Sequence, residues 1–176
     1  MTDFRDRTAC QMRVKNEARW IRGSLERTWR VASRAVILDD GSTDETYDEA
    51  LRSLSDDARY YRHDSPSGSE LWRDTDVSGR LRELCYVRSP FANDAVRPLE
   101  RANEIRDRNF LWYVLKANVP FEHVLCLDGD EWLSEEAIRT WPKVAAAMDA
   151  GVDFVQLPFV YLWDGVDQQR IDGIYG

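Results

Sequence analysis

Apolar residues occur along the chain in two patterns, short continuous runs and stripes at helical spacing. Compact apolar runs at 9–14, 34–40 and 123–128 are typical of strands that are buried on both faces. Helix-spaced stripes follow the first two runs, and another stripe over 102–118 precedes the third. This alternation predicts an α/β fold, a mostly parallel sheet flanked by helices, within a single domain.

Each predicted helix is defined by apolar positions, and two of the helices also have a candidate capping residue. The stripes comprise Ala18, Ile21, Leu25 and Trp29; Tyr47, Ala50, Leu51 and Leu54; and Ile105, Trp112 and Leu115. Ser42 and Glu45 match a capping box, S-x-x-E, at the start of the second helix. Ser134 is expected to cap a fourth helix, which Pro142 should interrupt or restart.

Three further segments have weaker patterns. Residues 58–63 predict a third strand, and 153–163 alternate like a strand in which Pro158 indicates an edge position or a bulge. Residues 64–100 are rich in Pro, Ser, Gly and Asp, so we expect an insertion or mobile loop there, carrying one short helix. A segment of this length is either a lid over a site or a surface excursion.

Composition indicates a globular chain with one core. The chain has 176 residues, of which 43% are hydrophobic and 11% aromatic. Its net charge of −8 argues against nucleic acid as the main partner. Residues 1–34 nevertheless hold nine basic and four acidic side chains. That basic segment is either a solvated helix face or a surface that touches anionic lipid.

Cysteine spacing and hydropathy bear on the compartment. Cys10, Cys85 and Cys126 form no CxxC pair, so neither a disulfide framework nor a zinc site is indicated, and a reducing compartment fits. Residues 1–10 lack the apolar region of a signal peptide, and no apolar run reaches the roughly 20 residues of a membrane span. We expect a cytoplasmic protein, and peripheral membrane contact stays open.

Polar and acidic residues gather where the predicted strands end. Asn16 and Glu17 follow the first strand, Asp39 and Asp40 end the second, and "DGDE" at 128–131 follows the last. Ligands of parallel α/β sheets bind at the carboxyl ends of the strands. We therefore expect these side chains to lie at one ligand-binding edge.

The Asp128-Gly129-Asp130 segment has the composition of a cation site. Carboxylates this close repel one another unless positive charge lies among them. Mg²⁺ commonly binds through one or two protein carboxylates and completes its shell with substrate phosphates and water. The spacing does not fit an EF-hand loop. Asp128 and Asp130 are thus predicted metal ligands, and the alternative is a solvated acidic turn.

Four segments occur in a characteristic order: "VKNEARWIRGSLE", "AVILDDGSTDET", "RDRNF" and "VLCLDGDEWL". Together they resemble the family 2 glycosyltransferases, and the resemblance covers residues 9–138. It implies the GT-A fold, a Rossmann-like nucleotide-binding domain. It also implies transfer of a sugar, with inversion, from a nucleotide-sugar donor, most often UDP-linked. The acceptor would be a hydroxyl of an unknown saccharide, lipid-linked or protein molecule.

The resemblance assigns donor binding to the matching positions. The nucleotide-sugar-binding set that it implies is Lys15, Asn16, Glu17, Asp39, Asp40, Ser42, Arg108, Asn109 and Asp128. Within this set, Asp40 would hydrogen-bond the base, and Arg108 and Asn109 would lie near the diphosphate. Asp128 and Asp130 would hold Mn²⁺ or Mg²⁺ on the diphosphate.

Several of these residues have a purely structural alternative. Asp40 could cap its turn, and Arg108 could form a surface ion pair with Glu104. Glu131 could bind a metal through water, or be an ordinary acid near a helix N-terminus. Trp132 could line a sugar pocket or pack in the core.

The acceptor side is where the chain departs from the family pattern. The later acid-rich and "QxxRW"-type elements of the family are missing, so we expect the C-terminal acceptor part to be short or missing. The chain is then either a truncated piece of a longer protein or a minimal protein that binds the donor without efficient transfer. Asp164 is the candidate general base among the few later acids. Two functions therefore stay open, a metal-dependent glycosyltransferase and a nucleotide-sugar-binding module without independent transfer activity.

Overall fold

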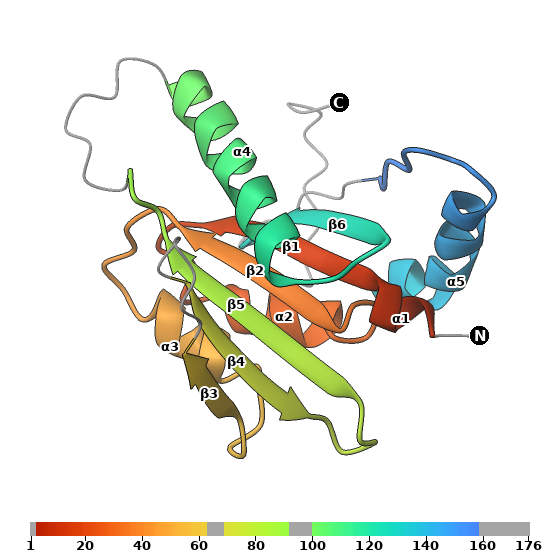
Figure 1. Ribbon diagram of the computed structural model, residues 1–176, viewed down its shortest axis with the longest axis horizontal. Helices are drawn as coiled ribbons and strands as arrows, with labels where there is room; N and C mark the ends of the chain where they lie inside the picture. Colours follow the sequence, from red (N-terminus) through yellow and green to blue (C-terminus); the bar gives the residue numbers. More distant parts are fainter. Residues whose placement is uncertain (1–2, 63–68, 92–99, 159–176) are drawn as a thin grey trace, which may run out of the picture.

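The computed structural model of the protein describes residues 3–62, 69–91 and 100–158 (Figure 1). The elements in chain order are α1 (Phe4–Arg7), β1 (Thr8–Val14), α2 (Ile21–Thr28), β2 (Arg34–Asp39), α3 (Thr46–Leu51), β3 (Arg59–Arg62), β4 (Glu70–Thr75), β5 (Leu81–Arg88), α4 (Glu100–Asn118), β6 (His123–Asp128) and α5 (Glu135–Asp149). The fold is α/β, as the alternating pattern predicts.

The described strands form one mixed sheet in the order β3-β4-β5-β2-β1-β6. Strands β5, β2, β1 and β6 are parallel, whereas β4 is antiparallel to both of its neighbours. The register pairs Val14 with Asp39, Asp39 with Arg88, and Arg13 with Asp128. These pairings place the carboxyl ends of the four parallel strands along one edge.

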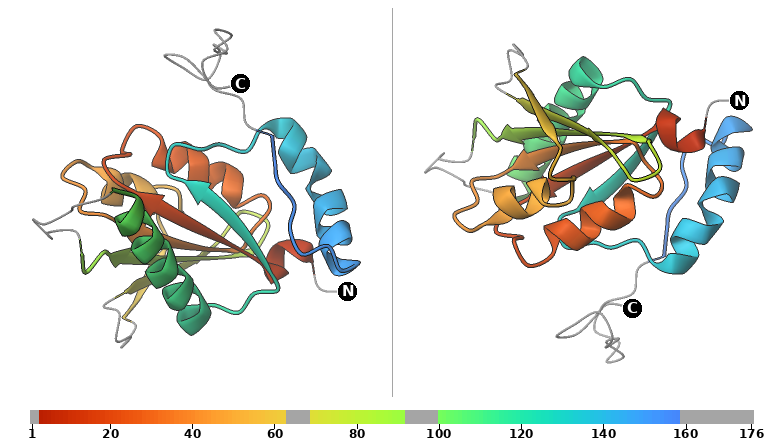
Figure 2. Two further views of the ribbon diagram at one scale, coloured as in Figure 1. Left: turned by 90° about the horizontal axis from the view of Figure 1, so that it is seen from above. Right: turned by 90° about the horizontal axis from the view of Figure 1, so that it is seen from below.

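The chain reverses direction across the sheet between β1 and β6. It passes from β1 through α2 to β2, reaches β5, and returns through α4 to β6 on the other side of β1. Right-handed crossovers that run in opposite directions put their helices on opposite faces. Figure 2 shows α2 and α4 on opposite faces of the sheet.

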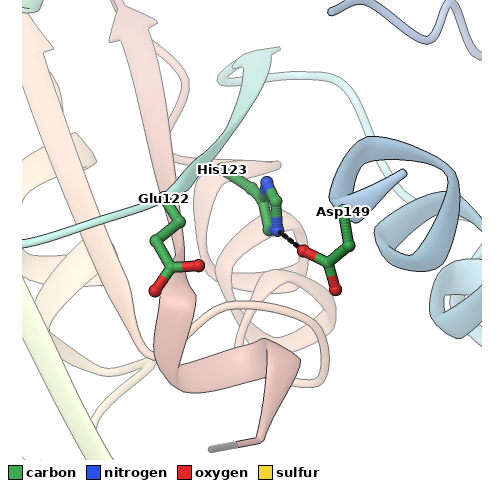
Figure 3. Close-up of side chains that lie close together, drawn as sticks. All are labelled: Glu122, His123 and Asp149. Atoms are coloured by element: carbon green, nitrogen blue, oxygen red, sulfur yellow. Dashed lines mark hydrogen bonds and ion pairs between the residues drawn. The ribbon is translucent and has the colours of Figure 1, made fainter. Parts of the chain in front are cut away.

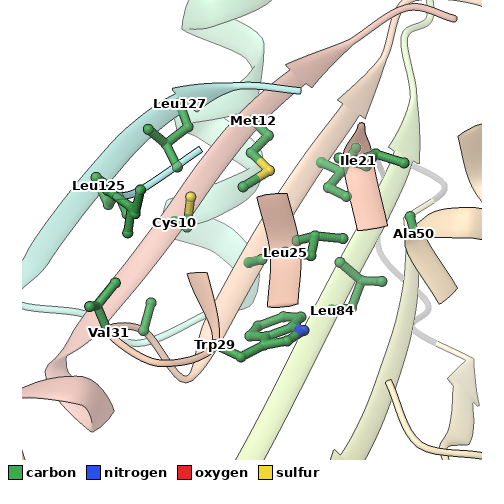
Figure 4. Close-up of a cluster of buried hydrophobic side chains, with 14 of the residues drawn as sticks. Cys10, Met12, Ile21, Leu25, Trp29, Val31, Ala50, Leu84, Leu125 and Leu127 are labelled. Atoms are coloured by element: carbon green, nitrogen blue, oxygen red, sulfur yellow. The ribbon is translucent and has the colours of Figure 1, made fainter. Parts of the chain in front are cut away.

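Each face of the sheet has its own apolar core. One core joins the sheet to α2, α3 and α5, and Figure 4 shows part of it, including Met12, Ile21, Leu25, Leu84 and Leu127. The other lies under α4 and includes Val36, Leu38, Leu111, Val114 and Leu115. Strand residues alternate between the two faces, and this alternation decides which side chains at the edge of the sheet can meet.

The prediction of a loop over 64–100 is wrong for the described residues. Strands β4 and β5 lie there, and β5 rather than β3 pairs with β2. Asp76 closes the hairpin by accepting hydrogen bonds from the Ser78 and Arg80 N–H groups, and Gly79 has a left-handed φ of 78°. The buried run Leu84–Val87 is the signal that the polar surroundings obscured. Residues 63–68 and 92–99 lie outside the described residues.

Two helices differ in detail from the prediction. The predicted stripe of α4 has the wrong phase, because Ile105 and Trp112 are exposed while Leu111 and Val114 are buried beside Leu115. The capping box at α3 is also wrong, since the helix begins at Thr46 and its N-cap, Glu45, makes no side-chain capping hydrogen bond. Both errors arise because tertiary contacts rather than local spacing orient these segments.

Helix α5 confirms one prediction and contradicts another. Ser134 Oγ accepts a hydrogen bond from the Ala137 N–H at 3.0 Å, as expected of an N-cap. The helix nevertheless continues through Pro142. Burial of Ile138 and Trp141 against the core offsets the cost of about 3 kcal/mol that an internal proline carries.

The segment after α5 is irregular as far as it is described. Residues 153–158 form no strand, so that part of the predicted strand over 153–163 is wrong, and 159–163 lie outside the described residues. None of the described helices combines the length and the apolar composition that crossing a bilayer requires.

Candidate functional site

The candidate site is the edge of the sheet where β1, β2, β5 and β6 end. In open α/β sheets, ligands bind outside the carboxyl ends of the strands, where the strand order reverses. Here the reversal lies between β1 and β6. The loop after β1 and the acidic turn after β6 therefore flank the position at which this architecture binds ligands.

The loops after β1 and β2 are joined by side-chain hydrogen bonds. Asn16 has a left-handed φ of 56°, and its Oδ1 accepts a hydrogen bond from the Thr43 N–H at 2.8 Å. In return, Ser42 Oγ accepts one from the Asn16 N–H at 3.0 Å. Thr46 Oγ1 accepts another from the Glu17 N–H at 2.8 Å. Asn16 and Ser42 thus hold the two loops in a fixed arrangement.

Asp39 has a structural role at the end of β2. It is buried, and its two carboxylate oxygens accept hydrogen bonds from the Ser42 N–H at 2.8 Å and the Tyr86 hydroxyl at 2.9 Å. Burial, followed by the charge of Asp39, raises the pKa of Tyr86, so the phenol stays a neutral donor. Asp39 rather than Asp40 therefore caps this turn.

Asp40 and Asp107 hold Arg13 between them. Because Met12 and Val14 pack on the α2 side, Arg13 points to the α4 side of the sheet. Its Nη2 donates a hydrogen bond to Asp40 Oδ2 at 3.0 Å, and its Nε forms an ion pair with Asp107 Oδ2 at 3.2 Å. Asp40 and Asp107 are only 1% and 0% exposed.

Two more basic side chains complete this buried charge cluster. The Lys15 Nζ lies 3.6 Å from Asp40 Oδ2, and the Arg106 Nε lies 3.6 Å from Asp107 Oδ1. Asp107 does not appear among the residues predicted from the sequence. It precedes the buried Leu111 by one helical turn and so occupies the sheet-facing side of α4, a side that only the packing of the helix reveals.

The turn after β6 presents two carboxylates. Asp128 ends the strand, and its backbone carbonyl accepts a hydrogen bond from the Glu131 N–H at 3.1 Å. The Glu131 side chain accepts one from the Asp128 N–H at 2.8 Å. The Arg108 Nη2 lies 3.1 Å from Asp128 Oδ1, whereas Asp130 is exposed. Arg108 therefore pairs with the predicted metal ligand.

The position of this turn depends on close packing against β1 and α2. A Cβ on Gly129 would lie only 2.8 Å from the Val14 Cγ1 atom, so no larger residue fits without movement. On the α2 side, Ser24 Oγ donates a hydrogen bond to the Glu131 carbonyl at 2.7 Å. The ring of Trp132 packs over Gly23, where a Cβ would lie 2.4 Å from it. Trp132 thus packs against α2 and is partly exposed.

Negative charge is concentrated beside the turn. Burial is the largest cause that raises the pKa of Glu17, to about 7, and the charges of Asp130, Asp44 and Asp128 add to it. Burial also raises the pKa of Glu131, with smaller contributions from Asp128 and Asp130. A cation at Asp128 and Asp130 would relieve this repulsion.

The donor set at Asp128 and Asp130 fits a hard divalent cation that shares a phosphate ligand. Two carboxylates are what Mg²⁺ commonly takes from a protein when phosphates and water supply the rest. Neither Asp128 nor Asp130 belongs to a group of three metal-capable side chains among the described residues. The protein would therefore supply only part of the coordination shell, and phosphate and water would supply the other ligands.

Three metal-capable side chains do lie together at the opposite edge of the sheet. Glu122, His123 and Asp149 place one donor atom each within 4.8 Å of one another (Figure 3). Arg7 already contacts both acids, at 2.9 Å from Glu122 and 2.8 Å from Asp149. The His123 Nε2 atom lies 2.9 Å from Asp149. This cluster serves to tie the end of α5 to the starts of β1 and β6.

The remaining predicted residues differ in position: one lies away from the site, one at its margin, and one outside the described residues. Asn109 is exposed on α4 and shares the outward face of Ile105 and Trp112, opposite to Asp107. Lys15 is exposed apart from its contact with Asp40. Asp164 lies outside the described residues.

A scan against models of protein families found no match, and a search of curated proteins found none either. The motifs of the chain and the geometry of this edge are therefore the observations that bear on its function.

Proposed function

We propose that the protein binds a nucleotide-sugar donor at the carboxyl edge of its sheet and acts as a metal-dependent glycosyltransferase of family 2, with a GT-A fold. The observation that carries the proposal is that carboxylates and guanidinium groups lie together where the strand order reverses. Asp128 and Asp130 follow β6, and Arg13 on β1 and Arg108 on α4 lie on the same side of the sheet. The carboxylates suit a divalent cation, and the guanidinium groups suit phosphates.

Asp128 and Asp130 would hold Mn²⁺ or Mg²⁺ on the diphosphate. When bound, the cation would supply the positive charge that stabilises the leaving diphosphate. Arg108 is already beside Asp128, so it needs only a small rotation to exchange the carboxylate for a phosphate oxygen. Lys15, about half exposed, is available to the same anion.

The structure favours supporting roles for some residues that the resemblance assigns to the nucleotide. Asn16, Asp39 and Ser42 form the hydrogen bonds that shape the two loops. Asp40 is buried against Arg13 and Lys15. In the proposed function these residues arrange the backbone around the ligand. Asp40 retains a direct contact with the base only if ligand binding releases it from its cations.

A second candidate, a donor-binding module without independent transfer, is favoured by one observation. Regular structure in the described residues ends with α5, and 152–158 add neither helix nor strand that could shape an acceptor site. In the transferase proposal, Asp164 stays the candidate general base toward an acceptor hydroxyl of saccharide, lipid-linked or protein origin. We further propose a cytoplasmic location, and peripheral contact with a membrane stays open.

Binding of UDP, GDP and TDP with and without Mn²⁺ tests the proposal, with thermal unfolding as the readout. A nucleotide at 100 times its dissociation constant should add about 2.7 kcal/mol of stability, a shift of roughly 5 to 10 °C for a chain of this size. Asp128→Asn/Asp130→Asn should abolish the metal-dependent part of the shift. Glu26→Gln/Glu136→Gln removes two charges from exposed helix positions and should leave the shift unchanged.

If no nucleotide gives a metal-dependent shift, the proposal is wrong. If nucleotides bind, metal-dependent hydrolysis of a panel of nucleotide sugars separates the two candidates. Release of free sugar supports the transferase, and tight donor binding without turnover to water or any acceptor supports the binding module.

A further inference from the structure

Arg13 and Asp107 are charged residues at positions that the packing otherwise gives to apolar side chains. Arg13 shares the α4 side of β1 with buried Ala9, and Asp107 continues the buried face of Leu111 on α4. Asp107 is fully buried, and its carboxylate forms ion pairs but no hydrogen bond within the described residues. Apolar residues commonly stabilise a fold at least as well as a buried ion pair does. Stability alone is therefore a weak reason for this pair.

The guanidinium of Arg13 is held on two sides and open on the third. Nε faces Asp107 at 3.2 Å, and Nη2 donates to Asp40 at 3.0 Å. Within the described part of the chain, Nη1 donates no hydrogen bond. The side chain is 26% exposed, unlike its two acidic partners. A guanidinium carries five N–H donors in a rigid plane. Contacts on two of its edges therefore also fix the direction of the donors on the third edge.

Arg13 lies next to the predicted cation ligand in the sheet. Arg13 and Asp128 are register partners on β1 and β6, the strands between which the chain order reverses. Adjacent strands lie about 4.8 Å apart, and residues in register share a face of the sheet. An anion bridged to Asp128 by a cation would thus lie within reach of Arg13.

We propose that Arg13 binds the diphosphate of the ligand directly and that Asp107 is the residue that positions Arg13 for this contact. This inference rests on the proposed function for the identity of the ligand, although its chemistry requires only a phosphate anion. Without Asp107, Arg13 keeps its bond to Asp40 and its guanidinium plane is free to turn.

The test measures the dissociation constants of UDP with Mn²⁺ and of inorganic pyrophosphate with and without Mn²⁺ by calorimetry. Arg13→Lys keeps the charge but loses the planar fork, and Asp107→Asn keeps the shape but loses the charge. Each should weaken binding of both ligands about tenfold. Arg34→Lys is the matched control, because Arg34 pairs with Glu83 at 2.8 Å at the other end of the same sheet. It should leave both constants unchanged.

Two readouts separate positioning from a merely structural role. If Asp107 acts through Arg13, the double variant Arg13→Lys/Asp107→Asn should bind no more weakly than Arg13→Lys alone. In addition, low millimolar guanidinium should restore pyrophosphate binding to Arg13→Ala by filling the space between Asp40 and Asp107. Methylammonium, which lacks the planar fork, should not.

The outcomes for this inference and for the proposed function are distinct. Arg13-dependent binding of pyrophosphate without metal-dependent binding of UDP supports the inference and contradicts the proposed function. If Arg13→Lys changes the dissociation constant of UDP by less than twofold, the inference alone is overturned. If the effects of Arg13→Lys and Asp107→Asn add in the double variant, the role of Asp107 is overturned. Failure of the wild-type protein to bind either ligand overturns both. Arg13→Lys, the mildest change, decides the question if Asp107→Asn does not fold.

Discussion

Arg108 and Asp128 are joined at the carboxyl edge of the sheet, with the Arg108 Nη2 3.1 Å from Asp128 Oδ1. The two side chains come from α4 and β6, and both are more than a third exposed. An exposed pair of this kind contributes no more than about 1 kcal/mol. The contact is thus weak enough for a ligand to rearrange, and Arg108 and a cation compete for the same carboxylate.

Replacing Arg108 should therefore change metal and nucleotide affinity in opposite directions. Arg108→Gln removes the competing charge, so Mn²⁺ alone should bind up to about fivefold more tightly. UDP with Mn²⁺ should bind more weakly, because a phosphate contact is lost. Electron paramagnetic resonance of free Mn²⁺ measures the first effect and calorimetry the second. Arg139→Gln on the exposed side of α5 serves as the control. Weaker binding of Mn²⁺ alone would contradict the competition.

Removing the Tyr86 hydroxyl should destabilise the fold. Tyr86→Phe leaves one oxygen of the buried Asp39 carboxylate without its donor, which was 2.9 Å away. Loss of such a bond typically costs about 1 to 3 kcal/mol. Urea unfolding should show a lower midpoint with an unchanged m-value. The exposed Tyr113→Phe should not change the midpoint, and equal effects of the two substitutions would contradict this role for Tyr86.

Gly129→Ala should displace the acidic turn. Its Cβ would meet the Val14 Cγ1 at 2.8 Å and the Glu17 Cγ at 3.0 Å, so the variant should lose about 1 to 3 kcal/mol of stability. Metal-dependent nucleotide binding should fall with it. Adding Val14→Ala makes room for the new methyl group and should recover part of the binding. A double variant that binds no better than Gly129→Ala would show that the contact with Val14 is not the cause.

Glu17 should make stability depend on pH. Its pKa in the fold is about 7, above the ordinary 4.5, so the protonated form is favoured by folding. Ionising Glu17 in the fold lowers the free energy of unfolding. This loss is absent below pH 4.5, grows between pH 4.5 and about 7, and is complete above that pH. Glu17→Gln should stabilise the protein by about 1 kcal/mol near pH 8, since solvent screens part of the shift, and by almost nothing near pH 4.

Chemical unfolding across this pH range measures the effect. Glu136→Gln, at an exposed position on α5, should show no such trend. A gain for Glu17→Gln that is equal at both ends of the range would contradict the raised pKa.

Most strands and helices that were predicted correctly have a strong local signal. The run of β2 is continuous and apolar, the runs of β1 and β6 are mostly apolar, and Ser134 caps α5 through atoms three residues away. The β4–β5 hairpin was missed because its buried run is short and lies in polar surroundings. Its partner in the sheet, β2, is far away in sequence. The phase of α4 was missed because the sheet, not the helix, selects which side is buried.

The residues of the candidate site also divide into those that the sequence indicates and those that only tertiary packing identifies. That Asn16, Asp39, Asp40 and Asp128 follow or end strands could be derived from the sequence, and so could their meeting at one edge, because parallel strands share a direction. Asp107 could not be identified in this way. Its position in a helix identifies it as a site residue only once α4 is packed on β1.

The sequence by itself determined the α/β class, the strands that end in acids, and the edge at which those acids lie, because each depends on local periodicity and on the direction of parallel strands. Only the tertiary structure decided how the acids divide their roles. Asp39 bonds to Tyr86, Asp40 and Asp107 hold Arg13, and Asp128 faces Arg108. Those partners come from segments far apart in the chain, and packing of α4 and β5 against the sheet brings them within a few ångströms.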